Sequence, residues 1–228
     1  MREVVLDTET TGFDPATGDR IVEIGCVELI DHLPTGRNFQ AYLNPERPVP
    51  IETTKVHGLT DEFLADKPLF AHIVEELLEF LGDAPLVIHN ASFDMKFVNS
   101  ELHRTGRRPI PHARAIDTIE IAKAKIPGAR YSLDELCKRF GIDLSARSKH
   151  GALLDAELTA RVYLELVGGR QTHLKLAPVD GAALVEEMGA VARARPRPLL
   201  SLISDAEREA HIRFIEKELG DSPLWRRN

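Results

Sequence analysis

Three short segments of the 228-residue chain carry acidic side chains, one of them with a histidine, in a pattern that could hold metal ions. The segments are Asp7-Thr8-Glu9, Phe93-Asp94, and His150 followed five residues later by Asp155. Asp7 and Glu9 are two residues apart, and on a strand such residues point to the same face. Four converging carboxylates would repel one another unless cations hold them. Ligands that offer only oxygen favour hard divalent cations such as Mg²⁺ or Mn²⁺.

The chemistry that fits this pattern is displacement at phosphorus. Two cations about 3.5 to 4 Å apart form a clamp, in which one activates the attacking water and the other stabilises the leaving 3′ oxygen. Asp7 is the natural bridging ligand because the pattern places it at the end of a strand. On a continuous helix His150 and Asp155 would lie about 140° apart. We therefore expect His150 in the loop before the helix, from where it can act on the water as general base.

Each of these features has an ordinary explanation when it is taken alone. An acidic pair can lie in a solvated turn, Asp94 can complement a helix N-terminus, and His150 can be a surface histidine. Asp155 is the stronger signal because it lies on an otherwise apolar helix face, where an unpaired carboxylate is costly. The carboxylates indicate a metal site only as a set.

The elements that must position these residues follow from the hydrophobic pattern. Alternating or short buried runs predict strands at residues 3–6, 21–29, 38–43, 86–88 and 115–117. Helical spacing and cap signals predict helices at 69–81, 92–105, 117–125, 132–140 and 151–167. Short turns join the first three strands, which suggests an antiparallel meander. The sequence therefore predicts an α/β domain with a mixed five-stranded sheet flanked by helices.

Composition sets the limits of the molecule. With 43% hydrophobic residues, the chain can form one sizeable domain and an additional segment. No apolar run approaches the roughly 18 residues that a membrane span needs, and no leader precedes the strand at Val4. Cys26 and Cys137 are expected to be buried free thiols. These features predict a cytoplasmic protein without a membrane partner.

The charge is unevenly distributed along the chain. The formal net charge is −7, whereas a protein that binds nucleic acid through phosphate contacts alone is usually basic. Residues 104–149 hold eleven Lys and Arg against five Asp and Glu. This basic stretch could be a solvated helical face. We expect any contact with nucleic acid to be local or to depend on metal ions.

The acidic motifs belong to longer phrases, which are VLDTETTG (5–12), VHG (56–58), VIHNASFD (87–94), SLDELC (132–137) and HGALLDA (150–156). Over residues 2–170 this combination resembles the histidine subclass of the four-carboxylate 3′→5′ exonucleases. Within that superfamily it is most similar to the proofreading subunits of bacterial replicative DNA polymerases. A tyrosine subclass has Tyr four residues before the last Asp, where this chain has Gly151.

The resemblance implies a ribonuclease H-like fold that hydrolyses DNA from a single-stranded or frayed 3′ end and releases nucleoside 5′-monophosphates. It implies two divalent cations, Mg²⁺ or Mn²⁺, held by Asp7, Glu9, Asp94 and Asp155, with His150 as general base. The implied contacts to the 3′-terminal nucleotide are Glu9, Glu52, His57 and Gly58. A flat imidazole and a residue without Cβ suit stacking on a base and close approach to it.

We expect four regions in the chain: the exonuclease domain (1–170), a clamp-binding motif (171–176), a linker rich in Ala, Gly and Pro (177–200), and a tail (201–228). Gln171, Leu174 and Leu176 are similar to the pattern that binds a sliding clamp. In the tail, Ser204 and Glu207 have capping-box spacing before a helix. The resemblance implies that the tail, with Leu224 and Trp225, binds the polymerase (alpha) subunit. A small third core subunit would be a further partner.

Two other interpretations remain open from the residues. An RNA-trimming 3′→5′ exonuclease of the same superfamily would share every catalytic residue, although it would need neither a clamp motif nor the tail. A non-catalytic interaction module could have kept the fold, but the five catalytic positions are intact.

Overall fold

The computed structural model describes residues 1–145, 147, 149–168 and 203–218. The chain divides into two compact units, Met1–Leu174 and Lys175–Asn228. Several predicted features lie outside the described residues. They are the clamp-binding residues Gln171, Leu174 and Leu176, the linker 177–200, and the tail residues Leu224 and Trp225.

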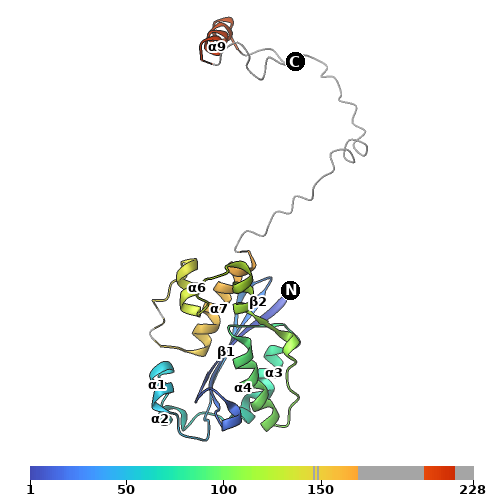
Figure 1. The fold of residues 1–228 in the computed structure, drawn as a ribbon. Coiled ribbons are helices and arrows are strands. Elements are labelled where there is room, and N and C mark those ends of the chain that lie inside the picture. The colour runs from blue at the N-terminus through green and yellow to red at the C-terminus, as the bar shows by residue number, and fades with distance from the viewer. Residues whose placement is uncertain (146, 148, 169–202, 219–228) are drawn as a thin grey trace, which may run out of the picture. The chain divides into compact units, whose positions relative to one another are not determined.

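Five strands form one sheet in the order β3-β2-β1-β4-β5, in which β1 and β2 are neighbours (Figure 1). They are β1 (Arg2–Thr10), β2 (Ile21–Ile30), β3 (Leu33–Tyr42), β4 (Leu86–Ile88) and β5 (Ala115–Asp117). The first three strands are antiparallel, as predicted, whereas β4 is parallel to β1 and β5 is parallel to β4. The predicted mixed five-stranded sheet is confirmed.

β1 is longer than the sequence pattern predicts. The expected strand ended at Leu6, but β2 pairs with β1 as far as Thr10, and Glu9 lies opposite Glu23. Asp7 and Glu9 are therefore inside the strand rather than at its end. Backbone pairing with β2 extends the strand through these polar residues, and their shared face follows from the pleat.

The helices of the first unit are α1 (Ile51–His57), α2 (Asp61–Leu64), α3 (Phe70–Leu81), α4 (Ala91–Arg104), α5 (Thr118–Lys125), α6 (Leu133–Phe140) and α7 (Ala152–Val167). Short 3₁₀ turns lie at Pro15–Thr17 and His112–Arg114. Helices α1 and α2 were not predicted, because each is short and mostly exposed and so has no apolar periodicity. The other five match the predicted ranges to within a residue or two.

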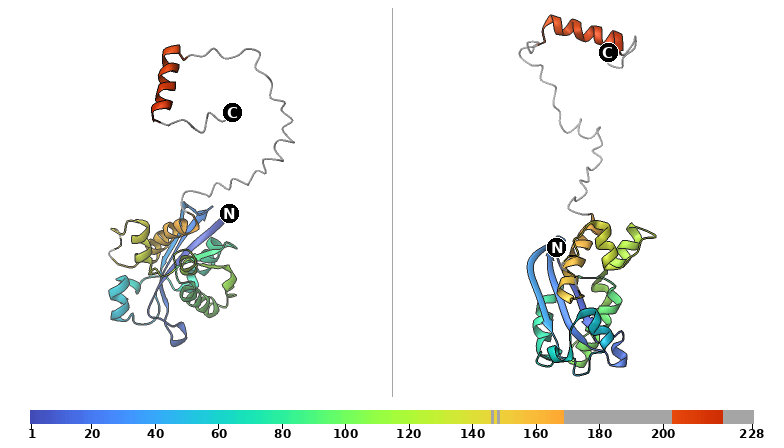
Figure 2. Two further views of the ribbon diagram at one scale, coloured as in Figure 1. Left: turned by 45° about the horizontal axis from the view of Figure 1, so that its top comes forward. Right: turned by 90° about the vertical axis from the view of Figure 1, so that its left-hand side faces the viewer.

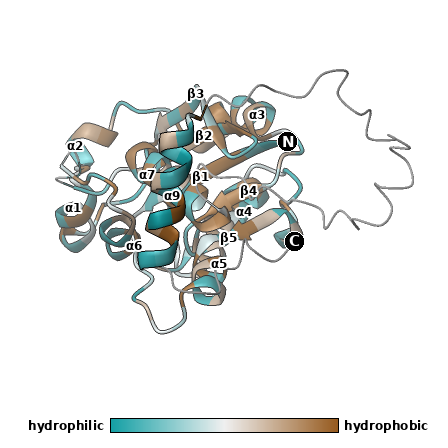
Figure 3. Ribbon diagram, turned by 90° about the horizontal axis from the view of Figure 1, so that it is seen from above, coloured by the Kyte–Doolittle hydropathy of each residue, from teal (hydrophilic) through white to brown (hydrophobic). Residues whose placement is uncertain are grey.

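The helices cover both faces of the sheet (Figure 2). Helices α3 and α4 pack on one face, against a cluster that includes Val4, Leu6 and Ile24. Helix α7 packs on the other face, where Val5 meets Ala156 and Ala160. Helices α5 and α6 extend this second layer against α7. Hydrophobic residues, brown in Figure 3, lie on the strands and on the helices that cover them. Cys26 and Cys137 are buried free thiols as predicted.

Helix α7 is held against the sheet at both ends. Near its start, a Cβ built on Gly25 of β2 would lie 2.3 Å from the Leu153 nitrogen, so only glycine permits this close approach. The carboxylate of the buried Glu23 accepts a hydrogen bond from the Ala152 nitrogen at 3.1 Å. Further along the helix, the Tyr163 hydroxyl donates to the buried carboxylate of Glu3 at 2.7 Å.

The described part of the second unit is helix α9 (Asp205–Glu218). The predicted capping box is present, because the Ser204 nitrogen donates to Glu207 at 2.9 Å and the Glu207 nitrogen donates to the Ser204 hydroxyl at 3.3 Å. Ile215 is buried, whereas Ile212 and Phe214 are exposed. In the described parts of both units, no helix combines the length and hydropathy that a membrane crossing requires.

Candidate active site

The four predicted metal ligands come from three elements of the first unit. Asp7 and Glu9 lie on one face of β1, Asp94 is in the first turn of α4, and Asp155 is in the first turn of α7. Glu9, Asp94 and Asp155 are 9%, 3% and 3% exposed. Carboxylates this deeply buried need a partner of opposite charge or a metal ion.

The start of α4 is fixed by a polar turn after β4. Asn90 has left-handed backbone angles, with φ 69° and ψ 60°, which asparagine tolerates better than most residues. Asp117 accepts hydrogen bonds from the Ala91 nitrogen at 3.0 Å and the Ile119 nitrogen at 2.8 Å. One carboxylate thus joins the N-termini of α4 and α5. The Thr8 hydroxyl donates to Asp94 at 2.7 Å and ties α4 to β1.

Burial and mutual repulsion favour the protonated form of three of these carboxyls. Burial is the main cause that raises the pKa of Asp7 well above its ordinary value, and the charges of Asp94, Asp155 and Glu9 add to it. Burial, followed by the charge of Asp155, raises the pKa of Glu9 to about 8. Burial also raises the pKa of Asp94 to about 7. A bound cation would compensate the negative charges and so favour the ionised form of these carboxyls.

Asp155 differs from the other three because Arg147 lies against it. Burial alone would raise its pKa, but hydrogen bonds from Arg147 and His150 outweigh burial and hold the pKa of Asp155 below its ordinary value. The Arg147 Nε and Nη2 atoms each donate to one Asp155 oxygen at 2.6 Å. Arg147 was not identified from the sequence, where it is one of many basic residues between 104 and 149.

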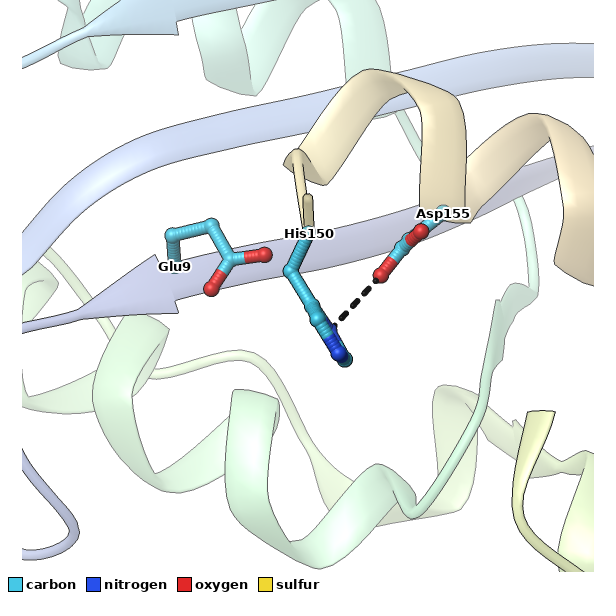
Figure 4. Close-up of side chains that lie close together, drawn as sticks. All are labelled: Glu9, His150 and Asp155. Atoms are coloured by element: carbon cyan, nitrogen blue, oxygen red, sulfur yellow. Dashed lines mark ion pairs between the residues drawn. The ribbon is translucent and has the colours of Figure 1, made fainter. Parts of the chain in front are cut away.

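His150 precedes α7 and is not part of it, as its spacing from Asp155 predicted. Its side chain is 47% exposed, and its Nδ1 lies 3.3 Å from an Asp155 oxygen (Figure 4). The His150 nitrogen donates to the Val56 carbonyl at 3.2 Å, so the loop before α7 rests on the end of α1. Arg147 Nη2, which can only donate, lies 2.9 Å from the same Nδ1. Nε2 becomes the ring nitrogen that could take a proton from water once Nδ1 donates to Asp155 instead.

The donor set fits a hard divalent cation. Glu9, His150 and Asp155 each place one ligand atom within 4.8 Å of the other two. Asp7 lines the same cleft, which has a volume of ≈ 320 Å³ and is also bordered by His89, Asn90, Ile119, Ser132, Leu133, Asp134, Arg147, His150 and Asp155. The carboxylate oxygens of this set are ligands that suit Mg²⁺ or Mn²⁺.

The predicted substrate residues lie beside this cleft on α1. His57 ends α1 and is 6% exposed. Its Nδ1 accepts from the Leu59 nitrogen at 3.0 Å. Its buried Nε2 makes no hydrogen bond of good geometry to the described residues, although the Thr10 backbone lies near enough to oppose the lowering of the His57 pKa by burial. Gly58 follows with φ 81°, and the Lys149 side chain crosses it so closely that a Cβ would lie 2.7 Å from Lys149 Cδ. Glu52 lies in the first turn of α1 and is exposed, unlike the buried His57 at the end of the same helix.

The fold and the carboxylate cluster together define a class of metal-dependent nuclease. A family model described as Exonuclease matches residues 4–163. Among solved structures, the nuclease domain of 3′hExo, a DEDDh family member, bound to rAMP, covers 73% of this chain and 91% of its own at a TM-score of 0.63 and 21% identity. Exonuclease X in complex with 5′ overhanging duplex DNA covers 72% and 90% at a TM-score of 0.56 and 27% identity. The predicted ribonuclease H-like fold is confirmed.

Curated relatives specify the family further. DNA polymerase III subunit epsilon of Rickettsia conorii is 51% identical over 191 residues, which are 82% of each chain. The protein of the same name from Escherichia coli K12 is 40% identical over 242 residues, covering 99% of this chain and 97% of that one. The chain belongs to the family of DNA polymerase III epsilon subunits within the exonucleases. This membership supports nuclease activity and does not favour a non-catalytic module.

Proposed function

We propose that this chain is a proofreading 3′→5′ exonuclease that hydrolyses the terminal phosphodiester of a single-stranded or frayed DNA end and releases nucleoside 5′-monophosphates. The observation that carries the proposal is the convergence of buried carboxylates from β1, α4 and α7, since burial and repulsion raise the pKa of Asp7, Glu9 and Asp94. Burying several carboxylates together lowers the stability of the folded protein unless cations bind them, and such clusters are typical of functional sites.

Asp7, Glu9, Asp94 and Asp155 are the proposed ligands of two divalent cations, Mg²⁺ or Mn²⁺. When bound, such cations activate a water molecule and stabilise the leaving 3′ oxygen. His150 is the proposed general base, because it is half-exposed beside Asp155 and its Nε2 faces away from that carboxylate. Asp155 orients the imidazole through Nδ1 and stabilises the protonated ring after the proton is transferred.

His57, Gly58, Glu52 and Glu9 are the proposed contacts of the 3′-terminal nucleotide. The support for His57 is its buried Nε2, which has no hydrogen-bond partner among the described residues and could donate to an oxygen of the nucleotide. Burial lowers the pKa of His57, so the ring is neutral near pH 7 and carries one N–H. Gly58 has no Cβ, and the space beside it is taken by the flexible Lys149 side chain, which would have to move aside for a base.

The proposed partners act through residues that follow the described part of the first unit, which ends at residue 168. The motif Gln171, Leu174 and Leu176 would bind the sliding clamp, and the tail with Leu224 and Trp225 would bind the polymerase (alpha) subunit. Support comes from the family, whose members are named as subunits of DNA polymerase III. A net charge of −7 is compatible with proofreading when partners keep the enzyme at the primer end.

The decisive experiment follows the degradation of a primer with a mismatched 3′ end on a gel. The reaction should require Mg²⁺ or Mn²⁺, remove the mismatched nucleotide first, and release mononucleotides. An RNA strand of the same sequence, run in parallel, should be degraded more slowly than DNA. Faster degradation of RNA would favour the RNA-trimming alternative, and hydrolysis in excess EDTA would contradict the metal-dependent site.

A further inference from the structure

Arg147 makes a fork-shaped contact inside the carboxylate cluster. Its Nε and Nη2 each lie 2.6 Å from a different oxygen of Asp155, and its side chain is 7% exposed. An arginine remains charged in a protein. Among the described residues, Arg147 is therefore the cation that neutralises Asp155, and it engages both oxygens that a metal ion would use.

We propose that Arg147 takes the place of a cation at Asp155 when the protein is metal-free and must withdraw when metal binds. The inference rests on the proposed role of Asp155 as a ligand. A guanidinium that donates to both oxygens of a carboxylate occupies the lone pairs between them and places a positive charge where a chelated metal ion would lie, so it competes with the metal. Binding of the metal at Asp155 therefore breaks at least one of the two contacts.

Asp134 provides a second partner to which Arg147 can turn. The Arg147 Nη1 atom contacts an oxygen of Asp134 in the first turn of α6. The Asp134 side chain is 47% exposed, whereas that of Asp155 is 5% exposed. Arg147 can thus leave the buried carboxylate and stay paired with the more exposed one. The cost of its withdrawal is reduced because its charge is never left unpaired.

The same movement affects His150. The Arg147 Nη2 atom lies 2.9 Å from His150 Nδ1 and 2.6 Å from Asp155 Oδ2, so it competes for both groups of the pair formed by the general base and the carboxylate that orients it. Withdrawal of Arg147 leaves the contact between His150 Nδ1 and Asp155, now 3.3 Å, free to shorten. Metal binding and orientation of the base are then coupled through one side chain, which makes Arg147 a positioning residue.

The test measures metal affinity without DNA, so that activity is not the readout. Full-length wild-type protein and the Arg147→Gln variant are titrated with Mn²⁺ at one pH, and free Mn²⁺ is followed by electron paramagnetic resonance. Removing the competing cation should tighten Mn²⁺ binding about ten-fold, since a hydrogen bond to a charged group is worth on the order of that factor. The matched control is Arg139→Gln, which removes an exposed positive charge on α6 and should change the affinity little.

Unchanged or weaker Mn²⁺ binding in Arg147→Gln would overturn the inference, because it would mean that Arg147 only orients the ligands. If that variant does not fold, Arg147→Lys serves in its place. It keeps the charge, loses the fork, and should tighten binding by a smaller factor.

Asp134→Asn should weaken Mn²⁺ binding in the wild-type background, where Arg147 would lose its alternative partner, and have little effect in the Arg147→Gln background. An equal effect in both backgrounds would contradict the exchange between carboxylates.

Failure of the proposed function would give a different result. If Asp155 is not a ligand, Asp155→Asn should bind Mn²⁺ as the wild type does. If Asp155→Asn loses the site and Arg147→Gln has wild-type affinity, the proposed metal site stands and only the role of Arg147 is wrong.

Discussion

Asp7 lies on the central strand, where its side chain is influenced by three other carboxylates. The charges of Asp94, Asp155 and Glu9 all raise its pKa, in addition to the effect of burial. A residue that we propose as a metal ligand is therefore also one of the most unfavourable when no cation is bound. Function and stability make opposite demands on this position.

Replacing Asp7 with Asn should separate these demands. Metal-dependent hydrolysis of single-stranded DNA should fall by at least about 100-fold, as is typical when an electrostatic contribution to the transition state is lost. At pH 8, without metal, the variant should have a higher Tm than the wild type, because a neutral amide replaces a carboxyl whose pKa is raised on folding. Thermal unfolding in EDTA and a gel assay measure the two effects. A variant that is both inactive and less stable would indicate a misfolded site.

At the residue scale, the sequence predicted a site residue where a charged side chain interrupts a pattern of apolar residues, because burying an unpaired charge is energetically unfavourable. Asp155 was noticeable because it interrupts an apolar helix face, and the position of His150 outside the helix followed from the angle between the two residues. Arg147 gave no comparable signal. Its partner is eight residues away across a loop, and nothing local distinguishes it from the neighbouring basic residues on the surface.

Helix α7 brings Asp155 to the sheet only because β2 has no side chain at Gly25. Gly25→Ala would place a Cβ 2.3 Å from the Leu153 nitrogen and force the first turn of α7 away. We expect a loss of at least about 1–3 kcal/mol in the free energy of unfolding, the usual cost of overpacking, together with a large loss of activity. Urea denaturation and the gel assay check both.

The matched control for this substitution is Gly151→Ala. A Cβ there would lie 3.8 Å from Glu23 Oε2, an ordinary contact, and the extended backbone with φ −157° suits any residue. The change should cost less than about 1 kcal/mol, as for a modest change at a helix N-cap. If the two variants were equally destabilised, the close approach of α7 to β2 would not be what makes Gly25 necessary.

At the element scale, the long periodic helices and the strand order of the meander were predictable, whereas α1 and α2 were not. Their existence depends on tertiary contacts such as those of Leu64 with Val22 and Val49. The extension of β1 to Thr10 likewise depends on pairing with β2. In both cases the determining partner is distant in sequence, so a local pattern carries little information about it.

The stability of the whole molecule should depend on pH through the carboxylate cluster. Because the pKa of Glu9 is raised from 4.5 to about 8, the folded protein holds a proton that the unfolded chain has released between these values. Stability of the metal-free protein is therefore lost as the pH rises from about 5 to 8. The decrease should be about 1 kcal/mol or more, since one pKa unit corresponds to about 1.4 kcal/mol.

Chemical denaturation in EDTA across this pH range measures the effect. The Glu9→Gln variant is the control, and its stability should decrease less steeply because it has no carboxyl at this position. Adding Mg²⁺ should stabilise the wild type most at the alkaline end, where the ligands are deprotonated. A steeper decrease in Glu9→Gln than in the wild type would contradict the assignment of the proton to Glu9.

Removal of residues 201–228 should separate the two proposed roles of the chain. The truncated protein should no longer bind the polymerase (alpha) subunit in pull-downs, yet it should degrade short single-stranded DNA at the wild-type rate, because the carboxylates all belong to the first unit. The double variant Leu224→Ala, Trp225→Ala tests whether the end of the tail makes this contact, and it should also lose binding to the polymerase subunit. Association that persists after truncation would show that the polymerase binds elsewhere.

The site joins the first strand of the domain to its last helix, since Asp7 and Glu9 are on β1 and Asp155 is on α7. During synthesis Asp7 and Glu9 therefore leave the ribosome well before Asp94 and Asp155 have been added to the chain. A product that stops before residue 155 carries the DxE and Phe93-Asp94 motifs but has no complete site. Fragments that end before residue 155 should consequently be inactive on DNA, and activity begins only when α7 has packed against β1, the strand that was made first.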